Sequence, residues 1–189
     1  MRQMLAAMIA LMLFGAVPAP ASAAAPDAAQ SARLDQLFQQ LKTAKTEGDG
    51  LFLEEQIVMI WLQSGDPMID QKMAWAIAAM DANSWDVALG YLDSIVLAKP
   101  DYAEGWNKRA TLYYFVGRYQ DSLSDIAHTL ALEPRHFGAI SGIGMIMEAM
   151  GEDQKALDAY KQALAIDPQL TNIQLEIFLL EDKIKGKRI

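Results

Sequence analysis

The 189-residue chain contains no cysteine and only two histidines. The absence of cysteine excludes disulfide bonds and the zinc sites that are built on cysteine thiolates. Short catalytic motifs are absent as well: we find no H-E-x-x-H, no G-x-S-x-G and no glycine-rich loop that would bind phosphate. We therefore predict a protein that is not an enzyme and that uses no metal and no cofactor, although a motif search does not detect an active site built from scattered residues.

Basic residues are outnumbered by acidic ones. The chain has 16 Lys and Arg against 24 Asp and Glu, which gives a formal net charge of −8. Binding to nucleic acid or to an anionic lipid surface needs a basic face, so this balance disfavours both partners. A content of 52% hydrophobic and 21% charged residues is typical of a chain that buries a core.

The first 32 residues differ in composition from the rest. A single Arg2 is followed by an apolar run from Met4 to Val17 and then by the small-residue triplet at 21–23. This order is typical of a secretory signal peptide, and the apolar run is shorter than the roughly 20 residues that span a bilayer. We expect residues 1–23 to be a signal peptide and the protein to be exported, to the periplasm, with an uncleaved anchor as the alternative. The Ala- and Pro-rich residues 24–32 should then form a disordered lead.

A period of 34 residues governs the middle of the chain. Pro100, Pro134 and Pro168 are each 34 positions apart, and they divide the chain into blocks 69–102, 103–136 and 137–170. Small residues and turn-forming residues recur at the same offset: Ala76, Ala110 and Gly144; Ala88, Ser122 and Ala156; Asn83, Gly117 and Gly151.

The spacing of the apolar residues explains what each block forms. Apolar side chains recur at steps of three and four, as in Trp106, Ala110 and Tyr113, which indicates helices. The turn residue separates two such helices, and the residue before each proline is pushed out of the helical region, so the second helix ends there. Each block is therefore predicted to be a helical hairpin, and the chain to be an all-α solenoid of stacked hairpins.

The segments on both sides of the three blocks also have helical patterns. Residues 33–68 contain two apolar stripes separated by Gly48-Asp49-Gly50, and we expect an atypical N-terminal helical hairpin that extends the stack as a terminal repeat. Residues 171–189 carry four apolar residues at helical spacing and should form a capping helix on the last repeat: Ile173, Ile177, Leu180 and Ile184.

These blocks resemble the tetratricopeptide repeats. The residues that match the family pattern are Trp106, Ala110, Tyr113, Gly117, Tyr119, Ser122 and Pro134 in the middle block; Gly144, Gly151, Ala156, Tyr160, Ala163 and Pro168 in the third; and Ala76, Trp85, Ala88 and Pro100 in the first. One departure is Arg109, at a position where the family prefers Leu; we expect its aliphatic stem to pack and its charge to reach the surface.

The resemblance implies a superhelix whose first helices line a concave groove that binds peptides. The groove residues that it implies are Met73, Ile77, Met80, Asn107, Lys108, Thr111, Tyr114, Arg135, His136, Ser141 and Met145. Some family members hold a peptide's terminal carboxylate with Lys, Asn and Arg, so the donor-rich set Asn107, Lys108, Arg135 and His136 is expected to attract an acidic segment. The match is partial, because the first block offers neither Lys nor Asn at groove positions.

Two functions are compatible with this pattern. The leading hypothesis is an exported, non-enzymatic module that binds a peptide or a partner subunit in its concave groove. The alternative is a structural or self-associating subunit of a cell-envelope complex. Fold alone does not name a ligand, so the identity of the partner does not follow from the sequence.

Overall fold

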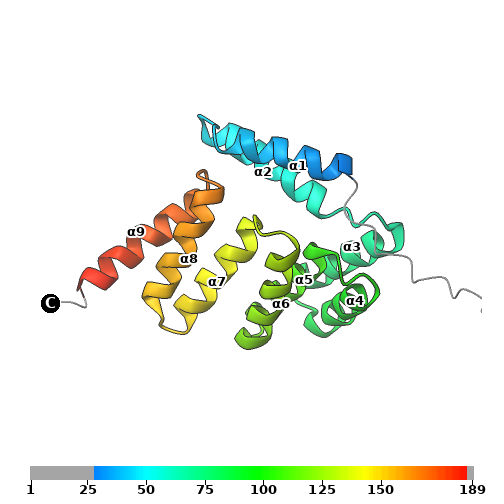
Figure 1. The fold of residues 1–189 in the computed structure, drawn as a ribbon. Coiled ribbons are helices and arrows are strands. Elements are labelled where there is room, and N and C mark those ends of the chain that lie inside the picture. Colours follow the sequence, from blue (N-terminus) through cyan, green and yellow to red (C-terminus); the bar gives the residue numbers. More distant parts are fainter. Residues whose placement is uncertain (1–27, 187–189) are drawn as a thin grey trace, which may run out of the picture.

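The computed structural model describes residues 28–186, which fold into nine helices joined by short turns and contain no strand (Figure 1). The predicted signal peptide and residues 24–27 lie outside the described residues. Within 28–186, no helix is both long and apolar enough to span a bilayer. The helices are α1 (Ala28–Leu41), α2 (Glu47–Trp61), α3 (Pro67–Asp81), α4 (Trp85–Ala98), α5 (Ala103–Phe115), α6 (Tyr119–Leu132), α7 (Phe137–Ala149), α8 (Asp153–Ile166) and α9 (Thr171–Gly186).

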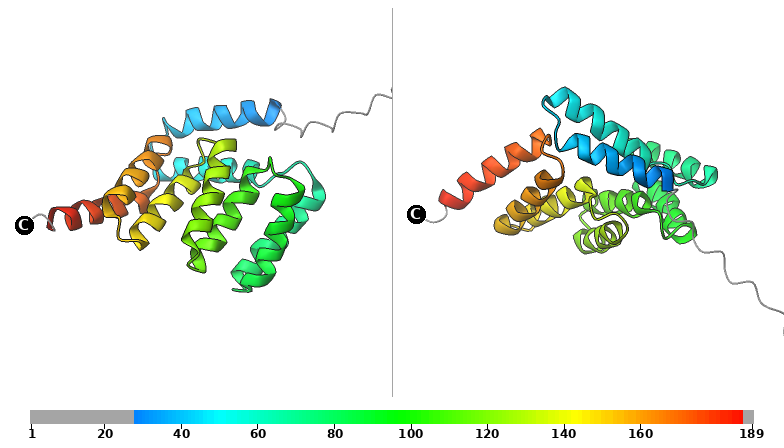
Figure 2. Two further views of the ribbon diagram at one scale, coloured as in Figure 1. Left: turned by 60° about the horizontal axis from the view of Figure 1, so that its bottom comes forward. Right: turned by 45° about the horizontal axis from the view of Figure 1, so that its top comes forward.

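Helices α3 to α8 form three consecutive hairpins, which we call the array, and this confirms the predicted all-α solenoid (Figures 1 and 2). The turn inside each hairpin has the same backbone conformation. Asn83, Gly117 and Gly151 have φ angles of 54°, 75° and 78°. Only Gly, and more rarely Asn, adopts such positive values at low cost, which explains why these residue types recur every 34 positions.

The recurring small residues lie where the two helices of a hairpin touch. Ala76 and Ala110 are buried, and Ser122 Oγ donates a hydrogen bond of 2.7 Å to the carbonyl oxygen of Ala110. At Gly144 even a single added Cβ would collide with the ring of Tyr160, which comes from the second helix of the same hairpin. The 34-residue repeat of the sequence therefore places a close contact between two helices at the same point of each hairpin.

Arg109 does not reach the surface as an isolated charge. Its guanidinium group forms a two-point ion pair with Asp125, with N–O distances of 2.7 and 2.9 Å, and a further bond of 2.7 Å to Asp93. Asp125 is buried, and the guanidinium also lies over the ring of Trp106 at 5.0 Å. Our expectation of a packed stem was incomplete, because the charge itself joins α5 to α4 and α6.

The α1–α2 hairpin, which we call the N-terminal hairpin, does not extend the stack. It lies across one edge of the array, where the loops between successive hairpins are found (Figures 1 and 2). Tyr102 Oη donates to the carbonyl oxygen of Leu62 at 3.0 Å, and Gln169 Nε2 donates to that of Ala44 at 3.2 Å. The hairpin buries large side chains, such as Phe38 and Trp61, over these loops.

The turn after α2 sends the chain into the array. Gly65 has a φ of 77°, and Asp66 caps α3 by accepting a hydrogen bond of 2.8 Å from the amide of Met68. Pro67 occupies the first turn of α3, where the missing N–H costs nothing. The hairpin and the array are therefore separate stretches of chain joined at a sharp, well-capped corner.

Two further expectations concern the ends of the described chain. Helix α1 begins at Ala28, so residues 28–32 are helical and not disordered. Helix α9 packs on α8 through buried Ile173 and Leu180, with Ile177 and Ile184 partly buried, in agreement with the predicted apolar stripe.

Candidate functional site

The candidate groove residues differ widely in exposure. Met73, His136 and Ser141 are buried; Met145 is exposed; the others are partly buried. Met73 belongs to the core between α3 and α4, and Ile77 and Met80 pack against that core. Ser141 and Thr111 each bond a carbonyl of the preceding turn, at Phe137 and Asn107. The apolar Met73–Met80 patch is therefore mostly part of the interior.

The donor-rich residues converge on one carboxylate of the chain itself. Glu104, at the start of α5, is buried and accepts from Asn107 Nδ2 at 3.0 Å, Lys108 Nζ at 3.1 Å and His136 Nε2 at 2.9 Å. The other ring nitrogen of His136 accepts from the amide of Ala139 at 3.1 Å, so Nε2 is the one that carries a proton toward Glu104. Burial alone would raise the pKa of Glu104, but His136 and Lys108 together hold it below its ordinary value.

Arg135 is also engaged within the chain. Its guanidinium bonds Glu133 at 3.0 and 3.1 Å and Asp35 of α1 at 2.6 Å. The same group lies over the ring of Phe38 at 4.4 Å. Of the four donors predicted to attract an acidic partner, three bind Glu104 and the fourth binds Glu133 and Asp35. An acidic segment would have to displace these internal carboxylates.

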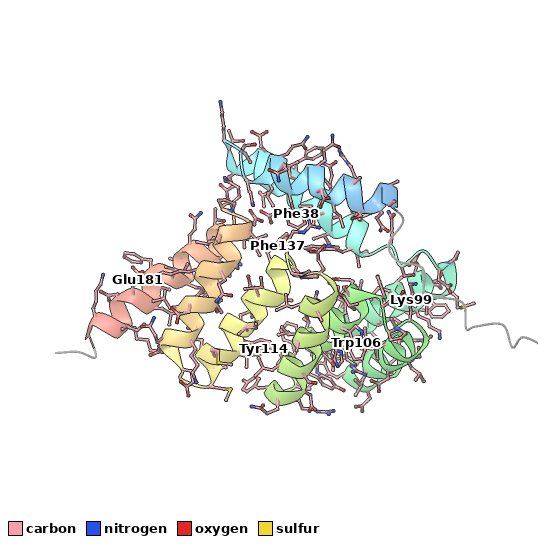
Figure 3. All side chains as sticks on the ribbon, in the orientation of Figure 1. Phe38, Lys99, Trp106, Tyr114, Phe137 and Glu181 are labelled. Atoms are coloured by element: carbon pink, nitrogen blue, oxygen red, sulfur yellow. The ribbon has the colours of Figure 1, made fainter. Side chains whose placement is uncertain are left out.

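The N-terminal hairpin completes this region with aromatic rings. Trp61 stacks on His136, with ring centroids 4.0 Å apart and planes inclined by 11°, and it contacts Phe137 at 5.2 Å. Phe38 meets Phe137 edge to face at 6.5 Å. Figure 3 shows Phe38 below α1 and Phe137 at the start of α7, in the space between the hairpin and the array. We call Phe38, Trp61, His136 and Phe137 the aromatic dock.

Sequence reasoning did not find the aromatic dock, because its members come from segments far apart that follow no common period. The available signals were weak: Phe38 and Trp61 stand on helical stripes, and Phe137 opens the third block. Glu104 stood one turn before Lys108, but its bond to His136 depends on the loop between α6 and α7.

A pocket of about 330 Å³ lies between the hairpin and the array. Leu34, Ile60 and Trp61 line it from the hairpin, and Tyr102 and Leu132 line it from the array. The acidic groups at its wall are paired, with Glu104 bound as described and Glu133 bound to Arg135. In the part of the chain that the structure describes, no three His, Cys, Asp or Glu side chains are placed to hold a metal ion.

A row of touching aromatic rings lies elsewhere on the array, near the turns inside the hairpins. Trp85 of α4 stacks on Phe115 of α5 at 5.8 Å, Phe115 touches Tyr114, and Tyr114 touches Tyr119 of α6, each at 5.8 Å. We call these four residues the aromatic row. Phe115 is 59% exposed, so the row presents a large apolar ring to solvent.

Comparison with known proteins identifies the family. A protein from Rhizobium etli described as TPR repeat-containing is 42% identical over 156 residues, which make up 82% of this chain and 76% of that protein. The chain belongs to the TPR (tetratricopeptide) repeat proteins. No family model matches the chain. The Hsp70-Hsp90 organizing protein of Triticum aestivum is 32% identical over 102 residues, which are 53% of this chain and 17% of that protein.

Solved TPR structures share the fold. The first TPR domain of Spaghetti (RPAP3), solved with an HSP90 peptide of sequence SRMEEVD, has a TM-score of 0.59 at 17% identity and covers 62% of this chain and 93% of its own. A MamA structure has a TM-score of 0.56 at 17% identity and covers 81% of both chains. At these identities the likeness establishes the architecture of the TPR array and leaves the ligand open.

Proposed function

We propose that the chain is a non-enzymatic protein-binding module, and that it holds an apolar segment of a partner protein against the aromatic row. The comparisons support the general role, because one TPR structure of the same fold was solved with an HSP90 peptide and one similar protein is named Hsp70-Hsp90 organizing protein. The observation that carries the proposal is the exposed Phe115 in contact with Trp85 and Tyr114. Contiguous apolar patches on a protein surface mark interaction sites, and aromatic residues are enriched among those that carry most of the binding energy at interfaces.

The proposal changes the expected chemistry of the partner. A free carboxylate is not required, because Asn107, Lys108 and His136 already bind Glu104. The aromatic row instead favours a segment with Leu, Met or aromatic side chains. Tyr114 is the one predicted groove residue that belongs to the row.

The test has two stages. A photo-crosslinking amino acid at position 115 is used to capture the partner in cells, and the same group at Leu97, which is 85% exposed on α4, serves as the control. The captured protein is then purified and titrated calorimetrically. Phe115→Ala should weaken binding by tenfold or more, equivalent to about 1.4 kcal/mol. Equal affinity of Phe115→Ala and the original protein would overturn the proposal, whatever was captured.

Self-association is the second candidate function, and one surface favours it. Leu175, Phe178 and Leu179 of α9 are all at least half exposed and lie on one side of that helix, next to the end of the array. A second copy could cover this stripe. Sedimentation velocity should then show a dimer that Phe178→Glu dissociates, whereas a monomer at high concentration would exclude this role.

Export remains part of the proposal, supported by Arg2, the apolar run Met4–Val17 and the Ala-Ser-Ala triplet at 21–23. The mature protein should begin at Ala24 or within two residues of it. N-terminal sequencing of the exported fraction measures this directly, and an intact Met1 there would contradict cleavage.

A further inference from the structure

Two carboxyl groups lie within interaction range of each other where the N-terminal hairpin meets the α8–α9 end of the array, at the place where Gly50 of α2 packs against the side chain of Gln169. Glu54 comes from α2, and Asp167 follows the last residue of α8. Asp167 is completely buried, and its Oδ1 accepts a hydrogen bond of 2.9 Å from the amide of Gln169. Its other oxygen, Oδ2, and the Oε1 of Glu54 are both buried without a hydrogen-bond partner. Two ionised carboxylates in this position would repel each other and leave both oxygens unsatisfied.

The surroundings offer no cation to offset the repulsion. Burial, followed by the negative charge of Asp167, raises the pKa of Glu54 to about 7, and burial raises the pKa of Asp167 as well. Among the described residues, no Lys or Arg forms an ion pair with either carboxyl. The charged groups on the elements packed around the pair are Lys42, Lys45, Glu47 and Glu55, which are exposed, Arg135, which binds Glu133 and Asp35, and Glu176, which is partly buried.

We propose that Glu54 and Asp167 share one proton, and that this proton fastens the N-terminal hairpin to the array. When the proton is present, the carboxyl that carries it donates to the other. When it leaves, the two carboxylates repel and the hairpin is released. The array stays folded, because its helices are held by their own contacts. This inference goes beyond the proposed binding function and does not depend on it.

The direction of the pH effect follows from the raised pKa. The docked hairpin binds the proton more tightly than the released hairpin, in which Glu54 returns toward its ordinary value of 4.5. The proton therefore stabilises docking fully below about pH 4.5, and this contribution is lost as the pH rises to about 7. Because a single proton is released, the docking equilibrium changes by at most about tenfold per pH unit.

Release would uncover groups that the hairpin now hides. Trp61 would leave the ring of His136, and Asp35 would leave Arg135. The surface exposed by this movement includes the apolar walls of the 330 Å³ pocket.

Spin labels can measure docking directly, since the chain has no native cysteine. Gln40→Cys on α1 and Gln162→Cys on α8 are both at exposed positions, and they place one label on the N-terminal hairpin and one on the array. Double electron–electron resonance should give a single narrow distance at pH 5.5 and an added population of longer distances at pH 8.5. Glu54→Gln supplies a permanent amide donor to Asp167 Oδ2, so its distribution should stay narrow at both pH values.

Glu55→Gln is the matched control, because it removes the same charge from the next residue, which is exposed. It should behave like the original protein. The proposal is overturned if the original protein gives the same distances at both pH values, or if Glu55→Gln abolishes the pH effect as Glu54→Gln does. Circular dichroism must show unchanged helix content at pH 8.5; a loss of helix that parallels release would mean unfolding, and would equally overturn it.

Discussion

The array and the N-terminal hairpin are both helical, yet different kinds of contact hold them in place. In the array, each hairpin joins its helices through small residues such as Ala110 and Gly144 and repeats the same turn every 34 positions. The hairpin instead docks through a few large rings and long-range bonds, such as Arg135 to Asp35 across 100 residues. The array is thus held by many similar local contacts, and the hairpin by a small number of individual ones, so single substitutions should separate the two.

The largest effect is expected from Trp61→Ala. The loss of a buried indole that stacks on His136 should cost about 3–5 kcal/mol of docking free energy, as truncation of large core aromatics does. Hydrogen exchange should accelerate in α1 and α2 while the amides of α5 to α8 keep their protection. Trp75→Ala, at a position that is 46% exposed in the array, serves as the control. Equal loss of protection in hairpin and array would show that they unfold as one unit.

The next effect concerns the ion pair inside the array. Asp125→Ala leaves the guanidinium of Arg109 with only Asp93, and we expect a loss of about 3 kcal/mol in the free energy of unfolding. Replacing both partners by leucine should restore most of it, since an apolar pair removes the unpaired charge. Urea unfolding followed by circular dichroism measures both variants. A double variant no more stable than Asp125→Ala would contradict this view of the pair.

A smaller effect tests the close approach of α7 and α8. Gly144→Ala forces the ring of Tyr160 to move and should cost about 2 kcal/mol, within the range for overpacked cores. The control is Gly90→Ala in α4, where an added Cβ meets nothing within 4 Å and should stabilise the helix by about 0.5–1 kcal/mol. Thermal melts of the two variants should therefore shift in opposite directions. A shift in the same direction would contradict the contact.

The smallest effect is expected at Arg118. This residue pairs with Asp121 at 2.8 Å, both side chains are about half exposed, and the guanidinium lies over the ring of Tyr113. Arg118→Ala should leave the thermal midpoint unchanged within error, because exposed ion pairs contribute little. A clear drop in the midpoint would mean that the contact with Tyr113 matters to the array.

The sequence contained enough information for the array and little for the hairpin's position. The offsets of Asn83, Gly117 and Gly151 predicted the turns, because each is needed for a conformation that other residues avoid. No such rule places Trp61 on His136: that contact depends on the sharp corner at Gly65 and on the loop before α7. The candidate site shows the same difference between what the sequence could and could not predict. Asn107 and Lys108 were located correctly on α5, but their internal acceptor, Glu104, was recognised only in the folded chain.

The position of the hairpin has a mechanical consequence. Open solenoids behave as springs, because each unit touches only its neighbours and small rotations add up along the stack. Here hydrogen bonds join the N-terminal hairpin and its flanking turns to three successive loops of the array: Tyr102 to Leu62, Arg135 to Asp35, and Gln169 to Ala44. Bending or stretching the array would change the spacing of those loops. The N-terminal hairpin spans all three loops and therefore resists that change. The curvature of the array should therefore be fixed while the hairpin is docked and adjustable once it is free.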